Sequence, residues 1–320
     1  IVGQFNFGGA AGRDATERDR GLVLAMRDSI AHRGPDDGGL WQSEDGRVVL
    51  GHRRLSIVDL SPAGHQPMSN EDGAVWITFN GEIYNHAELR QTLRLDDRHK
   101  FRSRADTEVI IHLYEERQQK VVEAIDGMFA FGLWDASRRR LMLARDRMGK
   151  KPLYYLITAG RLLFASEIKA LLGHPDVARR LDMVALNQYL TFSNVPEPRT
   201  MFEGIRKLPA GHTLVCNEHG DLTIERYWSP LDGPAWTAPA NRGEAVERVG
   251  DLVKQAVKKR VSVRRRAECD QVLVHLGRPW EGPRLHLEAS HTFPWRHAAA
   301  TLSVGGEEKL VGVSLGLGPL

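Results

Sequence analysis

The sequence predicts an α+β protein in which antiparallel sheets are covered by a few helices. From residue 1 to about residue 172, short apolar runs alternate with turn signals, and several runs are only a few residues apart. Runs at this spacing are typical of hairpins and hence of antiparallel pairing. Helical periodicity is limited to a few stretches, so a doubly wound parallel sheet is disfavoured.

The individual elements follow from the spacing of apolar residues. We expect strands over residues 48–57, 75–80, 128–135, 141–146, 154–157 and 162–165. The clearest helix is predicted over 16–31, where Leu22, Met26 and Ile30 share one face, and Gly34-Pro35 acts as a stop signal after it. Further helices are expected over about 86–95, 107–117, 167–172, 183–191 and 242–261.

The composition indicates a soluble globular protein. Of 320 residues, 42% are hydrophobic and 27% charged, with a net charge of +3. Basic and acidic residues are interleaved, so no nucleic-acid partner is expected. No apolar run approaches the roughly 18 residues of a membrane span, so no membrane partner is expected either. Two cysteines are too few for a disulfide framework, which favours a reducing, cytoplasmic location.

Nine short motifs occur in order along the chain. They are HRGPDD (32–37), GHRRLSIVD (51–59), FNGEIYN (79–85), DTE (106–108), RDR (145–147), KPLYY (151–155), SEIKAL (166–171), VPEPRT (195–200) and KLPAGH (207–212). This ordered set, within a match over about residues 1–261, resembles the class II glutamine amidotransferases. The PEPR and LPAGH segments make the asparagine synthetases the most similar branch of that family.

The resemblance implies an N-terminal-nucleophile hydrolase fold of four layers (αββα), with two antiparallel sheets stacked between helices. In intact members an α/β ATP-pyrophosphatase domain comes after it. The implied reaction is ATP-dependent asparagine synthesis, in which ammonia from glutamine attacks an adenylated aspartate. The implied partners are small molecules, namely glutamine, with aspartate, ATP and Mg²⁺ in the intact enzyme; a homodimer is left open. We predict no cofactor-binding residues and no metal ligands in this chain.

On this basis the chain divides into three parts. Residues 1–208 are predicted to be the glutaminase domain, residues 209–261 a junction with the first helix of the synthetase domain, and residues 262–320 a tail without assignment. The tail has no Ile, Asn, Tyr or Met and a single Lys. Its composition suggests out-of-frame translation, and a genuinely diverged tail is the alternative.

The tail also lacks the glycine-containing loop with which the family binds ATP. Intact synthetases carry a Ser-Gly-Gly-x-Asp-Ser loop for the pyrophosphate of ATP, whereas the nearest string here is SVGGEE at 303–308. This string lacks the Asp-Ser pair and places acidic residues where phosphate would lie, so we do not expect it to bind ATP. The basic run at 258–266 is interpreted as a solvated surface, because no aromatic platform accompanies it.

The family uses an N-terminal cysteine as its nucleophile. The free α-amine of that cysteine accepts the proton, which requires the cysteine to be the first residue. Family members begin Met-Cys-Gly, and Ile1-Val2-Gly3 matches the residues after that triplet. The nucleophile is therefore expected before Ile1, and the chain as written is expected to be inactive. Cys216 and Cys269 are interpreted as ordinary residues, because neither has a free α-amine.

The resemblance assigns five further residues. Asn80 and Gly81 would form the oxyanion hole, through the Asn amide and the Gly N–H. Arg54 would hold the α-carboxylate of glutamine with its bidentate guanidinium, and Asp106, with Glu82 nearby, would receive the α-ammonium. By spacing alone, Asn-Gly is also a hairpin turn, Arg54 a surface residue and Asp106 a helix N-cap.

Three other polar residues invite a catalytic interpretation. His32 and Asp36 lie in a helix-terminating segment that the mechanism does not require, so we interpret them as structural. Asp146, with its flanking arginines, is interpreted as part of an ion-pair cluster that holds the fold. Two functional alternatives stay open: a non-catalytic glutamine-binding remnant, and an amidotransferase with another acceptor.

Overall fold

The computed structural model describes residues 1–7, 13–56, 59, 61–233, 237–261, 286–289, 298–304 and 307–313. The chain divides into two compact units. The first comprises Ile1–Ala238 with Lys259–Arg264, and the second Pro239–Lys258 with Arg265–Leu320.

The first unit contains two six-stranded antiparallel sheets. The first sheet has the order β10-β8-β9-β1-β3-β2. Its strands are β1 (Val2–Asn6), β2 (Asp37–Gln42), β3 (Val48–Arg54), β8 (Tyr154–Thr158), β9 (Arg161–Ala165) and β10 (Arg206–Lys207). Strand β1 lies in the middle of this sheet, where Val2 is opposite Gly51 of β3 and Ala165 of β9.

The second sheet has the order β12-β11-β7-β6-β5-β4. Its strands are β4 (Met68–Ser69), β5 (Val75–Ile83), β6 (Gly127–Asp135), β7 (Arg140–Arg145), β11 (His212–Asn217) and β12 (Leu222–Arg226). Strands β11 and β12 lie beyond the predicted boundary at residue 208 and are hydrogen-bonded into this sheet.

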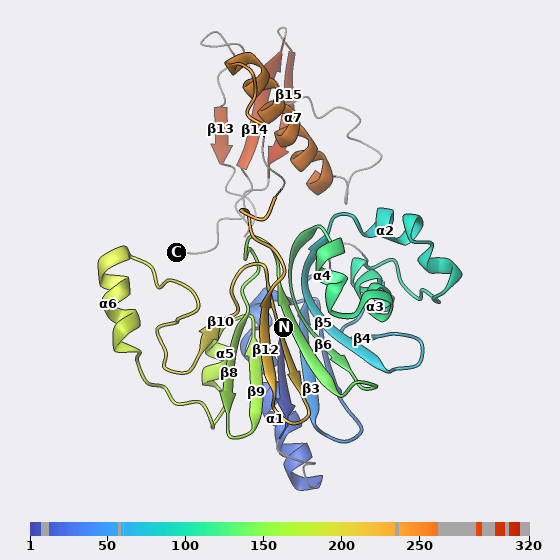
Figure 1. Ribbon diagram of the computed structural model, residues 1–320, viewed down its shortest axis with the longest axis vertical. Helices are drawn as coiled ribbons and strands as arrows, with labels where there is room; N and C mark the ends of the chain where they lie inside the picture. The colour runs from blue at the N-terminus through green and yellow to red at the C-terminus, as the bar shows by residue number, and fades with distance from the viewer. Residues whose placement is uncertain are drawn as a thin grey trace. The chain divides into compact units, whose positions relative to one another are not determined.

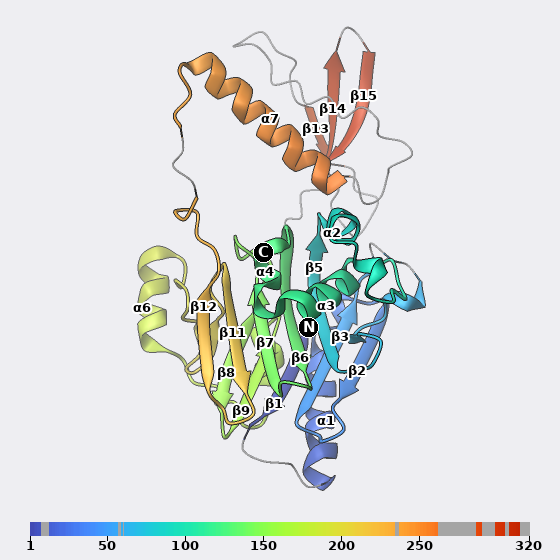
Figure 2. The ribbon, with the colours of Figure 1, turned by 45° about the vertical axis from the view of Figure 1, so that its right-hand side comes forward.

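The sheets lie face to face, and helices cover their outer faces (Figures 1 and 2). Helices α1 (Arg13–Ser29) and α5 (Ile168–Leu172) pack on the first sheet, and α3 (Asp106–Arg117) and α4 (Val121–Ala124) on the second. Helices α2 (His86–Thr92) and α6 (Met183–Phe192) complete the unit, with 3₁₀ turns at 31–33, 62–64, 95–97 and 118–120. The predicted α+β class with two stacked antiparallel sheets is confirmed.

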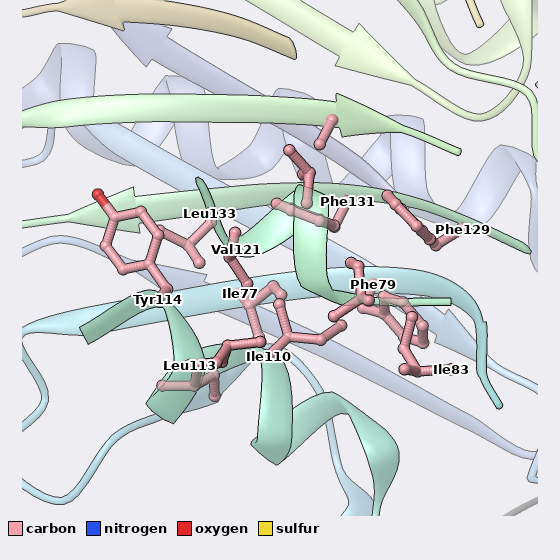
Figure 3. Close-up of a cluster of buried hydrophobic side chains, with 14 of the residues drawn as sticks. Ile77, Phe79, Ile83, Ile110, Leu113, Tyr114, Val121, Phe129, Phe131 and Leu133 are labelled. Atoms are coloured by element: carbon pink, nitrogen blue, oxygen red, sulfur yellow. The ribbon is translucent and has the colours of Figure 1, made fainter. Parts of the chain in front are cut away.

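The alternation of strand side chains separates three buried clusters. In β3, Val48 and Leu50 face the second sheet, whereas Val49 faces α1. In β5, Ile77 and Phe79 face outward and pack against Ile110 of α3 (Figure 3). This period of two is expected for strands that are buried on both faces. The packing of these side chains fixes how the two sheets lie against each other. The alternation along each strand then fixes which face its polar residues occupy.

Most predicted elements lie within a few residues of the observed ones, and the differences are local. The helix predicted over 16–31 runs from Arg13 to Ser29, because the chain tightens into a 3₁₀ turn at Ala31–Arg33 before Gly34. A Cβ on Gly34 would lie 2.3 Å from the backbone carbon of Arg53. Strand β3 ends at Arg54, and residues 57 and 58 of the predicted strand lie outside the described residues.

The second unit contains α7 (Arg242–Val261) as far as Lys258, and a three-stranded antiparallel sheet of order β13-β14-β15. These strands are β13 (His286–Ala289), β14 (Ala298–Val304) and β15 (Glu307–Val313). Val304 and Glu307 are paired across the β14–β15 connection. The prediction of a helix over 242–261 is confirmed, whereas strands β13–β15 occur in a tail for which the sequence predicts no elements. Gly305 and Gly306 of the SVGGEE string, like Cys269, lie outside the described residues.

Candidate active site

The amino end of β1 lies at the edge where the two sheets meet the 166–167 segment. The Ile1 amine donates to Ser166 Oγ at 3.0 Å, and Ser166 N–H donates to the Ile1 carbonyl at 2.9 Å. Burial, with a smaller contribution from Arg33, lowers the pKa of the Ile1 amine to about 5, while Glu167 opposes the change.

A pair of hydrogen bonds joins the sheets beside this amine. Thr78 Oγ1 of β5 donates to the Gly51 carbonyl of β3 at 3.1 Å, and His52 Nδ1 lies 3.3 Å from the same hydroxyl. Burial, the Ile1 amine and Arg54 all depress the pKa of His52, so its imidazole is neutral. Ile1, His52 and Arg54 therefore lie in one neighbourhood.

Asn80 follows Thr78 by two residues and therefore lies on the same face of β5, toward the first sheet. Strand β5 is continuous to Ile83, and Asn80 and Gly81 are opposite Ala130 and Phe129 of β6. The alternative of an Asn-Gly hairpin turn is thus wrong. Asn80 Nδ2 is buried and has no hydrogen-bond partner within the described part of the chain.

The side of β5 that faces away from β6, beyond its short pairing with β4, supplies a second donor. At this edge the N–H of Phe79 donates to Gln66 Oε1 at 2.7 Å, and the N–H of Ile83 donates to Asp106 Oδ2 at 2.8 Å. Backbone groups of alternate residues point the same way in a strand. The Gly81 N–H therefore points to this edge, between two N–H groups that side chains already satisfy.

Gly81 is also required for packing. A Cβ at this position would lie 2.2 Å from the Met128 carbonyl oxygen and 2.7 Å from the Phe129 Cα. These contacts are with the backbone of β6, which cannot move aside without opening the strand pair. The glycine thus permits the close β5–β6 contact, independently of any ligand.

Arg54 ends β3 and is buried, so it is not a surface arginine. Its Nη1 donates to the Ser61 carbonyl at 3.1 Å and its Nη2 to the Asp59 carbonyl. These bonds hold the guanidinium against the 59–64 loop, and a Cβ on Gly64 would collide with it. A fixed, desolvated guanidinium is suited to a carboxylate ligand.

Asp106 is buried and begins α3, where the N-cap position belongs to Ala105. The N-cap alternative for Asp106 is therefore wrong by one position, and its carboxylate instead bonds β5 through Ile83. Burial raises the pKa of Asp106 to about 6, and the charge of Glu82 adds to this effect. Glu82 is half-buried at the same end of β5. Together they form an anionic end of the site that would attract an ammonium group.

The other polar candidates are structural. His32 Nε2 lies 2.9 Å from Glu167 Oε1, and Asp36 Oδ2 accepts from the Ser56 N–H at 2.8 Å. Asp146 is buried and accepts from the backbone N–H groups of Met148, Lys150 and Lys151. It shapes the 146–151 turn through these bonds, and the ion pair of this region joins Arg145 to Glu197 instead.

Chemically, these residues offer two neutral donors at adjacent positions, a cation held by backbone carbonyls, and two carboxylates. An amide carbonyl that accepts from Asn80 and Gly81 would be polarised for attack by a nucleophile. The two stacked antiparallel sheets with helices on their outer faces confirm the predicted four-layer fold.

The chain belongs to the glutamine amidotransferase domain family, whose profile matches residues 7–228. It is 40% identical over 207 residues to asparagine synthetase [glutamine-hydrolyzing] 3 of Bacillus subtilis, covering 64% of this chain and 33% of the relative. It is 38% identical over 237 residues to asparagine synthetase 1 of the same organism, covering 74% and 36%. Similarity to "Amidase chry2" of Gibberella zeae is 37% over 244 residues, covering 75% and 35%. The chain thus spans about a third of these relatives.

The solved structures include a similar fold. Glutamine phosphoribosylpyrophosphate amidotransferase from B. subtilis superposes with a TM-score of 0.50 at 18% identity, covering 71% of this chain and 49% of that chain. At this identity the likeness concerns the fold alone. None of the described helices is long and apolar enough to cross a membrane.

Sequence reasoning did not single out three residues that the structure brings to the site. His52 and Ser166 lie within the recognised motifs, and Gln66 lies outside them, but no spacing rule connects any of the three to Ile1 or Phe79. They meet only because β1, β3, β5 and β9 come together at one edge. Nothing in the sequence marks Gln66, since its bond to the Phe79 N–H exists only in the folded chain.

Proposed function

We propose that the chain binds glutamine between Arg54 and Asp106 and hydrolyses its side-chain amide when a cysteine precedes Ile1. The observation that carries this proposal is the pair of donors at Asn80 and Gly81, because the buried Asn80 amide is left without a partner in the described structure. An unpaired buried donor costs about 1–3 kcal/mol, so a ligand that accepts from it is favoured.

In the proposed reaction, the cysteine sulfur attacks the amide carbon and the α-amine takes the thiol proton. The negative charge that develops on the amide oxygen is stabilised by the Asn80 Nδ2 and Gly81 donors. Collapse of the intermediate expels ammonia, which leaves with a proton from the α-amine, and water then releases glutamate from the thioester. Arg54 and Asp106 do not react but fix the two charged groups of the substrate.

We further propose that this ammonia serves ATP-dependent asparagine synthesis in a longer protein with a cytoplasmic location. The similarity to relatives named asparagine synthetase, of which this chain spans about a third, supports aspartate as the acceptor. ATP and Mg²⁺ would bind outside the glutaminase domain, since the 320 residues contain no Ser-Gly-Gly-x-Asp-Ser string. The partners of this chain would be glutamine and, through its ammonia, the acceptor site, without nucleic acid or membrane; a homodimer is compatible with this.

The test compares three chains that differ only before Ile1. One begins at Ile1, one carries Cys-Gly after removal of the initiator Met, and one carries Ser-Gly in its place. We expect calorimetry to detect glutamine binding in all three and glutamate release only from the Cys-Gly chain. Glutamine binding without glutamate release from the Cys-Gly chain would indicate a binding remnant, and absence of binding in all three would overturn the assignment of Arg54 and Asp106.

A further inference from the structure

A second polar cluster lies on the outer side of α3, apart from the glutamine site. It consists of Glu71 on the β4–β5 turn, His99 in the segment before α3, and His112 and Glu115 within α3. One ligand atom from each of these four residues lies within 4.8 Å of the other three. His112 and Glu115 are three residues apart on one helix, a spacing that metal ligands use, whereas nothing in the sequence connects them to Glu71 and His99.

The inner atoms of the cluster converge on one point. Glu115 Oε2 lies 2.8 Å from His112 Nδ1 and 3.4 Å from His99 Nδ1, and Glu71 Oε2 lies 3.8 Å from His112 Nδ1. The two imidazoles are stacked, with centroids 4.6 Å apart and planes 25° apart, so that both Nδ1 atoms face the carboxylates. Ligand atoms about 2.1 Å from a tetrahedral Zn²⁺ would be about 3.4 Å apart. The hydrogen bond between His112 Nδ1 and Glu115 Oε2 would therefore lengthen when the ion binds, whereas the other two distances would change by about 0.4 Å or less.

In both carboxylates of the cluster, the oxygen that points away from the centre accepts a hydrogen bond from another residue. Glu115 Oε1 accepts from Asn70 Nδ2 at 2.8 Å, and Glu71 Oε1 accepts from the Lys100 N–H at 2.5 Å. Each carboxylate therefore keeps one oxygen for the centre. This division fixes the orientation of both groups without using the inner oxygens.

The outer nitrogens of the two imidazoles also lie near carboxylates. His99 Nε2 lies 2.9 Å from Glu116 Oε1, and His112 Nε2 lies 3.9 Å from Glu108 Oε1. A histidine that ligates a metal through one nitrogen commonly donates its other N–H to a carboxylate, which orients the ring and raises its basicity. The His99 ring has such a carboxylate in place, whereas His112 Nε2 is buried and makes no hydrogen bond within the described part of the chain.

Burial and charge also favour a cation. The His112 side chain is 1% exposed and that of His99 12%, whereas Glu71 is 30% exposed on the β4–β5 turn. Four carboxylates surround the two rings, and of these Glu116 is paired with Arg98 at 2.5 Å. Two imidazoles and two carboxylates are a ligand set of Zn²⁺ and similar divalent ions, unlike the all-oxygen sets of Mg²⁺ and Ca²⁺.

We propose that Glu71, His99, His112 and Glu115 bind one Zn²⁺ in a closed, four-ligand structural site. The ion would fasten the β4–β5 turn and the segment before α3 to α3 itself. Because α3 begins with Asp106, this fastening would also hold one end of the glutamine site in place. The proposal does not depend on glutamine hydrolysis, since all of its ligands lie outside that site.

The experiment uses the full chain, without a histidine tag and stripped with a chelator. Calorimetry with Zn²⁺ alone should give one site per chain, and Zn²⁺ should raise the midpoint of thermal unfolding. Co²⁺ in place of Zn²⁺ should give the strong visible absorption of a four-coordinate ion. His99→Gln and Glu71→Gln should each weaken Zn²⁺ binding by at least about 10-fold, the loss caused even by an outer partner of a ligand.

His219→Gln, at an exposed histidine on the β11–β12 turn, is the matched control and should leave Zn²⁺ binding unchanged. The two test variants avoid the buried His112, so circular dichroism should show that they fold. Zn²⁺ binding by His99→Gln and Glu71→Gln that equals the control, or a stripped wild-type chain that binds no Zn²⁺, would overturn the proposal.

Discussion

Asn80 is the residue on which the oxyanion assignment rests. In the chain that begins Cys-Gly, Asn80→Ala should lower the turnover number for glutamine hydrolysis by about 10² to 10³, as expected for loss of one oxyanion donor. Glutamine affinity should change little, because the donor acts mainly on the developing charge. Glutamate release under saturating glutamine measures the effect, with Asn194→Ala, at an exposed loop asparagine, as control. A loss below about threefold would remove Asn80 from the mechanism.

The ionisation of Asp106 should make the stability of the protein depend on pH. Its pKa rises from 3.8 in the unfolded chain to about 6 in the folded protein, a difference of about two units or about 3 kcal/mol. Since the folded-state pKa is the higher one, the favourable contribution is complete below about pH 4 and is lost as the pH rises through 6. At neutral pH the buried carboxylate therefore destabilises the fold.

Asp106→Asn should remove that penalty. The variant cannot ionise but can still accept from the Ile83 N–H, so it should be more stable than the parent at pH 7.5, by an amount on the order of 1–3 kcal/mol. Near pH 3.5 the two proteins should be equally stable. Urea unfolding across this pH range measures the difference, and calorimetry should show that the variant no longer binds glutamine. A stability difference that does not change with pH would contradict the assignment.

At the scale of elements, glycines explain which strands the sequence reveals. Strands β5, β6 and β9 are predicted because their apolar residues form clear runs. Strands β1 and β2 are not, and both contain glycines that interrupt the apolar pattern, Gly3 and the Gly38-Gly39 pair. The structure shows a reason for these glycines: a Cβ would lie 2.3 Å from the Phe164 ring at Gly3 and 1.8 Å from the Gln66 carbonyl at Gly39. From the sequence alone, a glycine that permits close packing cannot be distinguished from a glycine that forms a turn, because the segment packed against it is not known.

The same limit applies to the candidate site. Motif order located Arg54, Asn80, Gly81 and Asp106 in the sequence, but only the strand pairing indicates which donors are free. The unpaired Asn80 amide and the direction of the Gly81 N–H depend on the register of β5 against β6. The proposed Zn²⁺ ligands come from three elements, and only His112 and Glu115 are at a spacing that the sequence could have revealed.

Two glycines provide a matched test of packing. Gly81→Ala should destabilise the protein by about 1–3 kcal/mol, because its Cβ would meet the β6 backbone at 2.2 Å. Gly21→Ala should instead stabilise it by up to about 1 kcal/mol, because Gly21 is exposed within α1 and its Cβ would meet nothing within 4 Å. Chemical denaturation of the two variants measures both changes. Equal effects would show that the β5–β6 contact does not require a glycine.

At the scale of the molecule, the buried clusters define which part of the chain folds on its own. All three are built from residues of the Ile1–Ala238 unit. The cluster between the sheets includes Leu214 and Cys216 of β11, both 0% exposed. Burial raises the pKa of Cys216 to about 11, so its thiol stays protonated and serves as an apolar side chain. Strand β11 therefore belongs to the core of the glutaminase fold.

Two truncations test this conclusion. A chain that ends at Ala238 should keep the cooperative thermal transition of the first unit, because both of its sheets are complete. A chain that ends at Leu208 loses β11 and β12 and exposes β7, whose residues 140–144 pair with β11. It also leaves a cavity where Leu214 was, and removing a buried leucine side chain alone costs about 2–5 kcal/mol. We expect this shorter chain to unfold at a markedly lower temperature or to aggregate through the open edge of β7. Equal melting temperatures for the two truncations would instead support a glutaminase domain that ends at residue 208.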